Sequence, residues 1–223
     1  MNLFVVLFLK LLHGESFTNV RAIYYLEQAK YFGRRGVVHK AIQYCTETLK
    51  LDVDNFYALA GLATASVQKK DYRLALDYAN KAILSSTKNV SVTSREQLHV
   101  LLAVVSEMMG KSDSLKSATD RIAALHDGDF AAVYARLGRA YFDFGIHERA
   151  RHYYEEVRMI YPNKSAPYYN LARVYISEGD VEMAKQELMK ALNLAEDGKK
   201  RKQVLRQLEL IGRIKGESPE HGE

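Results

Sequence analysis

The chain repeats a pattern of side chains every 34 residues, and this interval constrains its fold more than any other feature. The matched pairs are Tyr134 and Tyr168, Leu137 and Leu171, Gly138 and Ala172, Tyr141 and Tyr175, Gly145 and Gly179, and Ala150 and Ala184. Within each copy, apolar residues fall at helical spacing, stop at a short turn, and resume at helical spacing. Each copy is therefore expected to form two antiparallel helices. One such pair cannot bury its apolar face alone, so the copies are expected to stack.

Five copies align along the chain. They cover residues 22–55, 56–89, 96–130, 131–164 and 165–198, and the array spans residues 22–195. Small residues mark the places where the two helices of a copy should touch: Ala29, Ala63, Ala103, Gly138 and Ala172 on the first helix, and Ala41, Ala75, Ala150 and Ala184 on the second. The third copy diverges most, because His99, Ser106 and Thr119 stand where the other copies have large apolar or aromatic residues.

The last two copies resemble the tetratricopeptide repeat family. The residues that carry the resemblance are Tyr134, Leu137, Gly138, Tyr141, Gly145, Ala150, Tyr154 and Pro162, followed by Tyr168, Leu171, Ala172, Tyr175, Gly179, Ala184, Leu188 and Ala191. The resemblance implies an all-α fold, a right-handed α-solenoid of about five helix–turn–helix repeats with an N-terminal helix and a C-terminal capping helix. It also implies a non-catalytic scaffold or adaptor that holds a peptide or a partner helix in a concave groove.

The segment after the last copy is predicted to be the capping helix, over residues 199–215. Val204, Leu205, Leu208 and Ile211 form one apolar stripe in an otherwise polar stretch, and residues 216–223 are expected to be a frayed tail. The basic run from Lys199 to Lys202 has two interpretations. It is a solvated helix start, or it binds RNA or anionic lipid. RNA binding by this helix is kept as a lesser alternative function.

Residues 1–17 also leave two interpretations open. An apolar run extends from Leu3 to Leu9 and is interrupted by Lys10. This run is short for a membrane span. It is either a helix packed on the first repeat, or an export signal or membrane anchor that uses residues 3–12. The second interpretation would make the protein a membrane-associated or exported assembly factor of a cell-envelope complex, so the sequence leaves its location undetermined.

No catalytic or metal-binding pattern stands out in the chain. His147 and His152 are five residues apart, which places them about 140° apart around a helix, so they cannot share a metal as two histidines four apart do. Cys45 is the only cysteine, which excludes a disulfide within one chain. No nucleophile elbow or phosphate-binding loop is found. We expect no enzyme activity, no cofactor and no metal site.

The resemblance implies which side chains face the groove, because the family uses fixed places on the first helix of each repeat. The candidate partner-binding residues are Lys30, Arg34, Tyr57, Gln68, Arg139, Phe142, Asp143, Tyr169, Asn170 and Arg173. The third copy is expected to add Val100, Val104, Glu107 and Met108. A formal net charge of +5 and four cations among the candidate residues make an acidic peptide the favoured ligand.

Other partners are considered on the same grounds. The family's chaperone-type carboxylate clamp needs an asparagine where this chain has Gly61, so a chaperone tail is not expected. Nucleic acid is not expected as the main partner, because the chain lacks a long basic stripe with aromatic residues between the cations. Self-association through exposed Tyr and Met side chains of the terminal repeats stays open.

Overall fold

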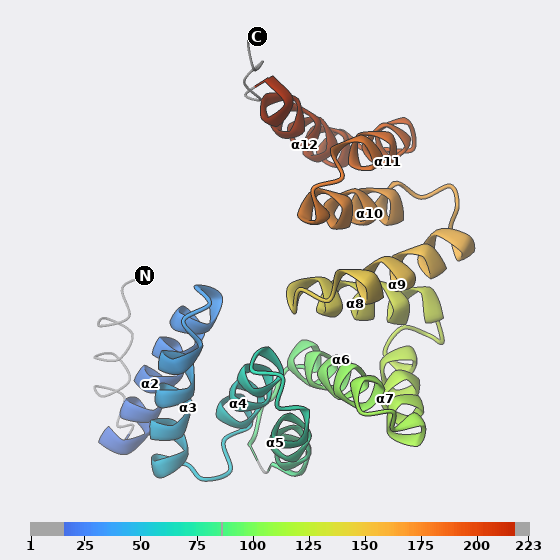
Figure 1. Cartoon of the computed structure of the whole chain (residues 1–223). Coiled ribbons are helices and arrows are strands. Elements are labelled where there is room, and N and C mark those ends of the chain that lie inside the picture. Colours follow the sequence, from blue (N-terminus) through green and yellow to red (C-terminus); the bar gives the residue numbers. More distant parts are fainter. Residues whose placement is uncertain (1–15, 86, 217–223) are drawn as a thin grey trace. The chain divides into compact units, whose positions relative to one another are not determined.

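The computed structural model describes residues 16–85 and 87–216, and all of its regular elements in these ranges are α-helices (Figure 1). They are α2 (Phe17–Arg34), α3 (Val38–Leu51), α4 (Phe56–Gln68), α5 (Tyr72–Leu84), α6 (Val92–Met108), α7 (Ser112–Ala124), α8 (Phe130–Asp143), α9 (His147–Ile160), α10 (Ser165–Glu178), α11 (Val181–Asn193) and α12 (Gly198–Gly216). The predicted fold class, an all-α solenoid of helix pairs, is confirmed. Residues 1–17 and the tail, residues 216–223, lie outside the described ranges, apart from Ser16, Phe17 and Gly216, so the structure does not test the interpretations of these two segments.

The chain divides into two compact units, residues 1–122 and 123–223, and each is described by itself. Unit 1 holds α2 to α6 and most of α7, and unit 2 holds α8 to α12. Within each unit, a helix packs on its neighbour in sequence or on the next helix but one. Side chains cap the N-terminal ends of several first helices: Ser16, Asn55 and Asp129 accept hydrogen bonds from backbone amides of the first turn.

Every helix pair is closed by the same backbone turn. A residue with positive φ follows the first helix, and the amide of the next residue donates to a carbonyl five residues back, at 2.8–3.0 Å. The residues with positive φ are Gly36, Lys70, Gly110, Gly145 and Gly179. This pattern satisfies the last carbonyls of the helix and reverses the chain. Glycine adopts this conformation without strain, so Lys70, at φ 61°, is the costly member of the series.

The first two pairs of unit 1 share a core of small and apolar side chains. Ala29, Cys45, Ala58 and Leu62 are buried together, which lets α2, α3 and α4 approach closely. A polar network then joins the end of α5 to the loop before α4. The hydroxyl groups of Ser85 and Thr87 donate to the Asp54 carbonyl at 2.6 and 3.1 Å, and Thr87 Oγ1 accepts from the Phe56 amide at 2.9 Å.

The third pair, α6 and α7, keeps the turn expected at Gly110, but one of its side chains lies differently from the prediction. α6 begins at Val92, earlier than the expected start at residue 96. Val104 was expected to face the groove, and this prediction is wrong, because its side chain is fully buried. His99 is half-buried on the same helix, and burial lowers its pKa, with Arg121 and Arg95 adding to the effect.

Unit 2 packs more regularly. Gly138 on α8 faces the ring of Tyr154 on α9, and Tyr154 is 1% exposed. The equivalent place in the next pair has Ala172 against Leu188, both fully buried. A small residue therefore admits a large partner ring in one pair, and a slightly larger residue faces a smaller side chain in the other. Ion pairs also link the layers, as between Arg151 on α9 and Glu178 on α10 at 2.6 Å.

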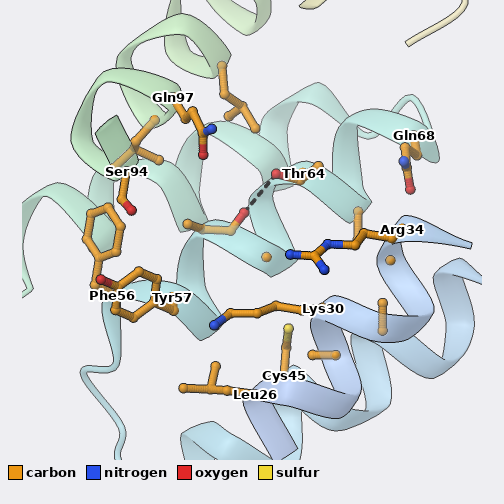
Figure 2. Close-up of a pocket in the computed structure, with 18 residues that line it drawn as sticks. Leu26, Lys30, Arg34, Cys45, Phe56, Tyr57, Thr64, Gln68, Ser94 and Gln97 are labelled. Carbon is orange, nitrogen blue, oxygen red and sulfur yellow. Dashed lines mark hydrogen bonds between the residues drawn. The ribbon is translucent and has the colours of Figure 1, made fainter. Parts of the chain in front are cut away.

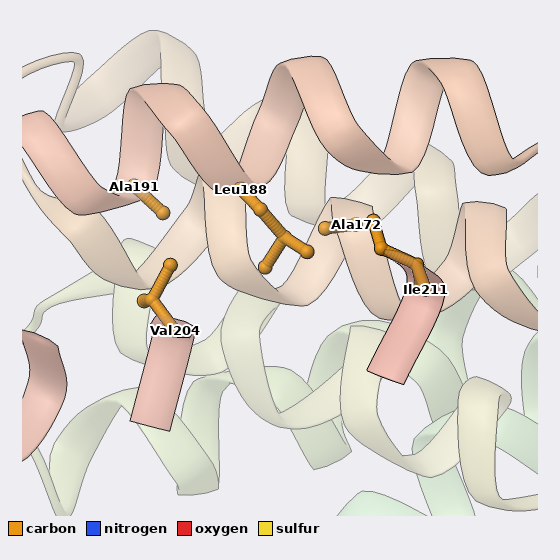
Figure 3. Close-up of a cluster of buried hydrophobic side chains, with 5 residues drawn as sticks. All are labelled: Ala172, Leu188, Ala191, Val204 and Ile211. Atoms are coloured by element: carbon orange, nitrogen blue, oxygen red, sulfur yellow. The ribbon is translucent and has the colours of Figure 1, made fainter. Parts of the chain in front are cut away.

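The last helix, α12, closes unit 2. Its Val204 and Ile211 pack on Ala172, Leu188 and Ala191 and are themselves 2% and 3% exposed (Figure 3). Val204, Ile211 and, in part, Leu208 of the predicted stripe thus cover the last pair, as a capping helix should, whereas Leu205 stays exposed.

Candidate functional site

A pocket of about 410 Å³ opens on unit 1, where the first helices of three successive pairs come together (Figure 2). Its lining residues come mainly from α2, α4 and α6, with two from α3. They are Leu26, Ala29, Lys30, Gly33, Arg34, Ala41, Cys45, Phe56, Tyr57, Ala60, Gly61, Thr64, Ala65, Gln68, Ser94, Gln97, Leu98 and Leu101. Four of the predicted groove residues, Lys30, Arg34, Tyr57 and Gln68, lie in this set.

Two cations reach from α2 into the pocket, as Figure 2 shows. Lys30 is already held: its ammonium lies 2.7 Å from a Glu27 carboxylate oxygen and 5.6 Å from the centre of the Tyr57 ring. Arg34 follows one turn later on the same helix face. Within residues 16–85 and 87–216, the Arg34 side chain has no hydrogen bond and no ion pair. Arg34 is therefore the cation with the most binding capacity left.

The wall between α3 and α4 is closely packed. A Cβ atom at Gly61 would lie 2.7 Å from Cys45 Sγ, so the absence of a side chain at Gly61 lets α4 lie against α3. This contact explains why the asparagine of the chaperone-type clamp has no room here. Cys45 is 3% exposed, and burial raises the pKa of its thiol to about 11. The thiol is accordingly a small packing group and not a nucleophile.

The polar side chains that line the pocket differ in how many hydrogen bonds they can still make. The Thr64 hydroxyl donates to the Ala60 carbonyl at 3.0 Å, and Ser94 Oγ lies 2.8 Å from Ser91 Oγ. The exposed amides of Gln68 and Gln97 have no hydrogen-bond partner in the described part of the chain. Glutamine can both donate and accept, which suits the backbone of an extended peptide.

Gln97 was not among the predicted site residues, although a signal for it existed. It occupies the second place of the third copy, the place that Tyr57 holds in the second copy. The divergence of the third copy concealed this equivalence.

The predicted groove residues of unit 2 do not line this pocket. Arg139 is exposed, and its Nε lies 3.7 Å from a carboxylate oxygen of Asp143, one turn on, which makes a weak surface ion pair. The Arg173 guanidinium lies over the Phe142 ring, 4.4 Å from its centre. A cation over the face of an aromatic ring is attracted by the ring, so Phe142 helps to hold Arg173 in place.

The other two predicted residues of unit 2 lie on α10. Tyr169 is half-buried against the cluster that α12 covers, which leaves less of its ring for a ligand. Asn170, its neighbour in sequence, is half-buried as well.

The described residues offer little for other kinds of site. No three His, Cys, Asp or Glu side chains gather there in a way that could hold a metal ion. None of the helices in those ranges has the length and apolar character that a membrane crossing requires. The Tyr154 phenol, whose pKa burial raises to about 12, is packed under Gly138 and unsuited to proton transfer near neutral pH.

The fold and the pocket define a helical-repeat protein with a ligand-sized cleft on its first helices. The tetratricopeptide repeat family model matches residues 131–164 and 166–197, so these two segments are tetratricopeptide repeats and the resemblance is confirmed. Repeats of this family support a role as a protein-interaction scaffold. No match was found among curated proteins.

Several solved structures are similar to this chain. A crystal structure of MamA shares 22% identity, with a TM-score of 0.47, over 78% of this chain and 91% of that one. YrrB, described as a TPR protein with an unusual peptide-binding site, shares 20% identity, with a TM-score of 0.48, over 83% and 92%. PilF of Pseudomonas aeruginosa shares 14% identity, with a TM-score of 0.49, over 90% and 88%.

Proposed function

We propose that the protein is a non-catalytic scaffold whose unit 1 binds an extended acidic segment of a partner protein in the pocket of α2, α4 and α6. The observation that carries this proposal is Arg34, a cation that lines the pocket and has no partner among the described residues. A carboxylate of the ligand would pair with it in two parallel hydrogen bonds, a geometry that arginine favours.

Apolar contact would supply much of the affinity. Leu26, Leu98 and Leu101 line the pocket together with Phe56, and a volume of about 410 Å³ lies within the usual range for ligand pockets. Because the walls are helices held by buried side chains, the protein would lose little conformational freedom on binding. The ligand would therefore carry one or two apolar side chains next to its acidic residue.

Lys30 and Arg34 would play unequal parts. Lys30 would have to share its charge between the ligand and Glu27, which lies 2.7 Å away. Arg34 has no partner among the described residues that it would give up when a ligand arrives. We therefore expect a charge reversal at Arg34 to weaken binding more than neutralisation of Lys30.

The test uses an array of synthetic peptides with graded numbers of Asp and Glu, probed with the labelled full chain. We expect the retained peptides to be acidic and to contain an apolar residue beside the acid. For the best peptide, Arg34→Glu should raise Kd about 10- to 100-fold, the range found for central charged contacts in interfaces. Fluorescence anisotropy measures both constants.

The control is Arg73→Glu, which makes the same charge change on α5, at an exposed residue that does not line the pocket. It should leave Kd within about twofold, since a distant surface charge acts mainly through screened fields. Selection of peptides without acidic residues, or equal loss in the two variants, would contradict the proposal.

A further inference from the structure

The outer face of α12 carries a line of cations. Lys199, Lys202 and Arg206 follow one another at intervals of three and four residues, so they lie on one side of the helix. This side is opposite the one that buries Val204 and Ile211, because residues advance about 100° around a helix. All three cations are exposed. We call this line the α12 basic face.

The α12 basic face is electrically unbalanced. The nearby Asp197 lies 3.5 Å from Lys200 and does not pair with the three cations of the face. Within the described ranges, Lys199, Lys202 and Arg206 have no ion pair or hydrogen bond of their side chains. Glu209 is the only acidic residue between Gly198 and Gly216, and it lies three residues after Arg206 at the edge of the same face, so the three cations outnumber it. A neutralising surface from outside the chain would therefore find these charges available.

The three cations of the α12 basic face do not help α12 to cap unit 2. The positive end of the helix dipole lies at the first turn, so Lys199 and its basic neighbours destabilise the start of α12. The packing that closes unit 2 depends on Val204 and Ile211 instead. These charges oppose the helix dipole and contribute nothing to the packing of α12. They therefore indicate a contact with another molecule or surface.

We propose that the α12 basic face rests on an anionic membrane surface, with Lys199, Lys202 and Arg206 against lipid phosphates. Leu205 and Leu210 flank the line on its two sides and are 43% and 44% exposed. Exposed leucines beside cations fit the boundary between headgroups and acyl chains. Nucleic acid gives these leucines no partner, and α12 has no aromatic residue on which bases could stack.

The contact would be peripheral. The apolar stripe of α12 already covers Ala172, Leu188 and Ala191, so the helix cannot turn that stripe into the bilayer while it caps unit 2. Binding would consequently rest on charge and fall steeply with salt, because surface charges are screened beyond about 10 Å at about 0.1 M salt.

The test is flotation of the full chain with vesicles of phosphatidylcholine, with and without phosphatidylglycerol. The variant Lys199→Gln/Lys202→Gln/Arg206→Gln should bind the anionic vesicles about 100-fold more weakly, at about fivefold per cation. Removing cations near the start of α12 relieves their conflict with the helix dipole, so the variant should stay folded, which circular dichroism can verify.

The matched control is Lys69→Gln/Lys111→Gln/Lys116→Gln, which removes the same charge at exposed residues of unit 1. It should lower binding by less than about threefold, through net charge alone. Vesicles of pure phosphatidylcholine report any contribution of the apolar residues 3–12, which all three proteins share.

Three results would overturn the proposal. The first is failure of wild type to bind anionic vesicles, and the second is equal loss in the variant and the control. The third is binding to an RNA duplex that is stronger than binding to vesicles and is lost in the variant, which would assign the face to nucleic acid. Loss in the variant alone, together with release at high salt, would support the membrane contact.

Discussion

Replacement of Gly138 by alanine tests the packing of unit 2 directly. A Cβ atom there would lie 2.8 and 2.9 Å from two carbons of the Tyr154 ring, and that ring is 1% exposed and cannot move aside. Overpacking costs about 1–3 kcal/mol, and alanine regains about 1 kcal/mol through its helix propensity. We therefore expect Gly138→Ala to lower the free energy of unfolding by about 1 kcal/mol. Urea denaturation followed by circular dichroism gives the value, provided the m-value is unchanged.

The next helix pair supplies the rescue and another glycine supplies the control. The variant Gly138→Ala/Tyr154→Leu copies Ala172 and Leu188 into the equivalent places, so its loss should be at least about 1 kcal/mol smaller than the sum of the two single losses. Gly33→Ala, whose Cβ would lie 4.0 Å from the Cβ of Ala41, should stabilise the protein by about 0.5 kcal/mol. A stable Gly138→Ala, or additive effects in the double variant, would refute the packing argument.

Other predictions follow from the turns, caps and the buried thiol. Gly145→Ala should cost about 1 kcal/mol of stability from its φ of 74° alone, since no atom lies within 4 Å of the added Cβ. Lys70→Gly should gain about 1 kcal/mol of stability, because it relieves the same kind of strain. Thermal denaturation shows whether each variant is less or more stable than the wild type. Asn55→Ala should cost about 1 kcal/mol, because its side chain accepts from the Ala58 amide at 3.1 Å, and urea denaturation measures the loss. Burial raises the pKa of Cys45 from 9.0 to about 11, so the unfolded chain releases this proton at lower pH than the folded one. The free energy of unfolding of the wild type, relative to that of Cys45→Ala, should therefore fall as the pH rises through this window. A difference that does not change with pH would contradict the burial of the thiol.

The repeating pattern was sufficient to predict the fold class, because the spacing of apolar residues and the position of the turns are properties of sequence alone. Gly145 and Gly179 stand where the chain must adopt a positive φ, and glycine indicates such places. The turn at Lys70 has the same geometry without glycine, so its left-handed residue could not be identified from composition. Val104 was assigned to the groove from its place in the third copy, but its burial depends on the packing around α6, which the sequence alone does not show.

The candidate site was only partly accessible to sequence reasoning. Family positions indicated that Lys30 and Arg34 share a face, but their inequality depends on Glu27 and Tyr57, which only the arrangement of side chains reveals. The pairing of Arg139 with Asp143 follows from their spacing of four and was foreseeable. The stacking of Arg173 on Phe142 joins two repeats and requires the packing between them.

The packing of each helix on its near neighbours has a consequence for how the chain is made. In both units the contacts join helices that are adjacent or one apart in sequence. The helices on which a new pair packs have therefore just been synthesised when that pair leaves the ribosome. Little chain must be closed into long loops, which favours rapid folding. Each unit can therefore acquire its structure during synthesis, pair by pair. The last apolar surface, formed by Leu188 and Ala191, is then exposed until α12 emerges to cover it.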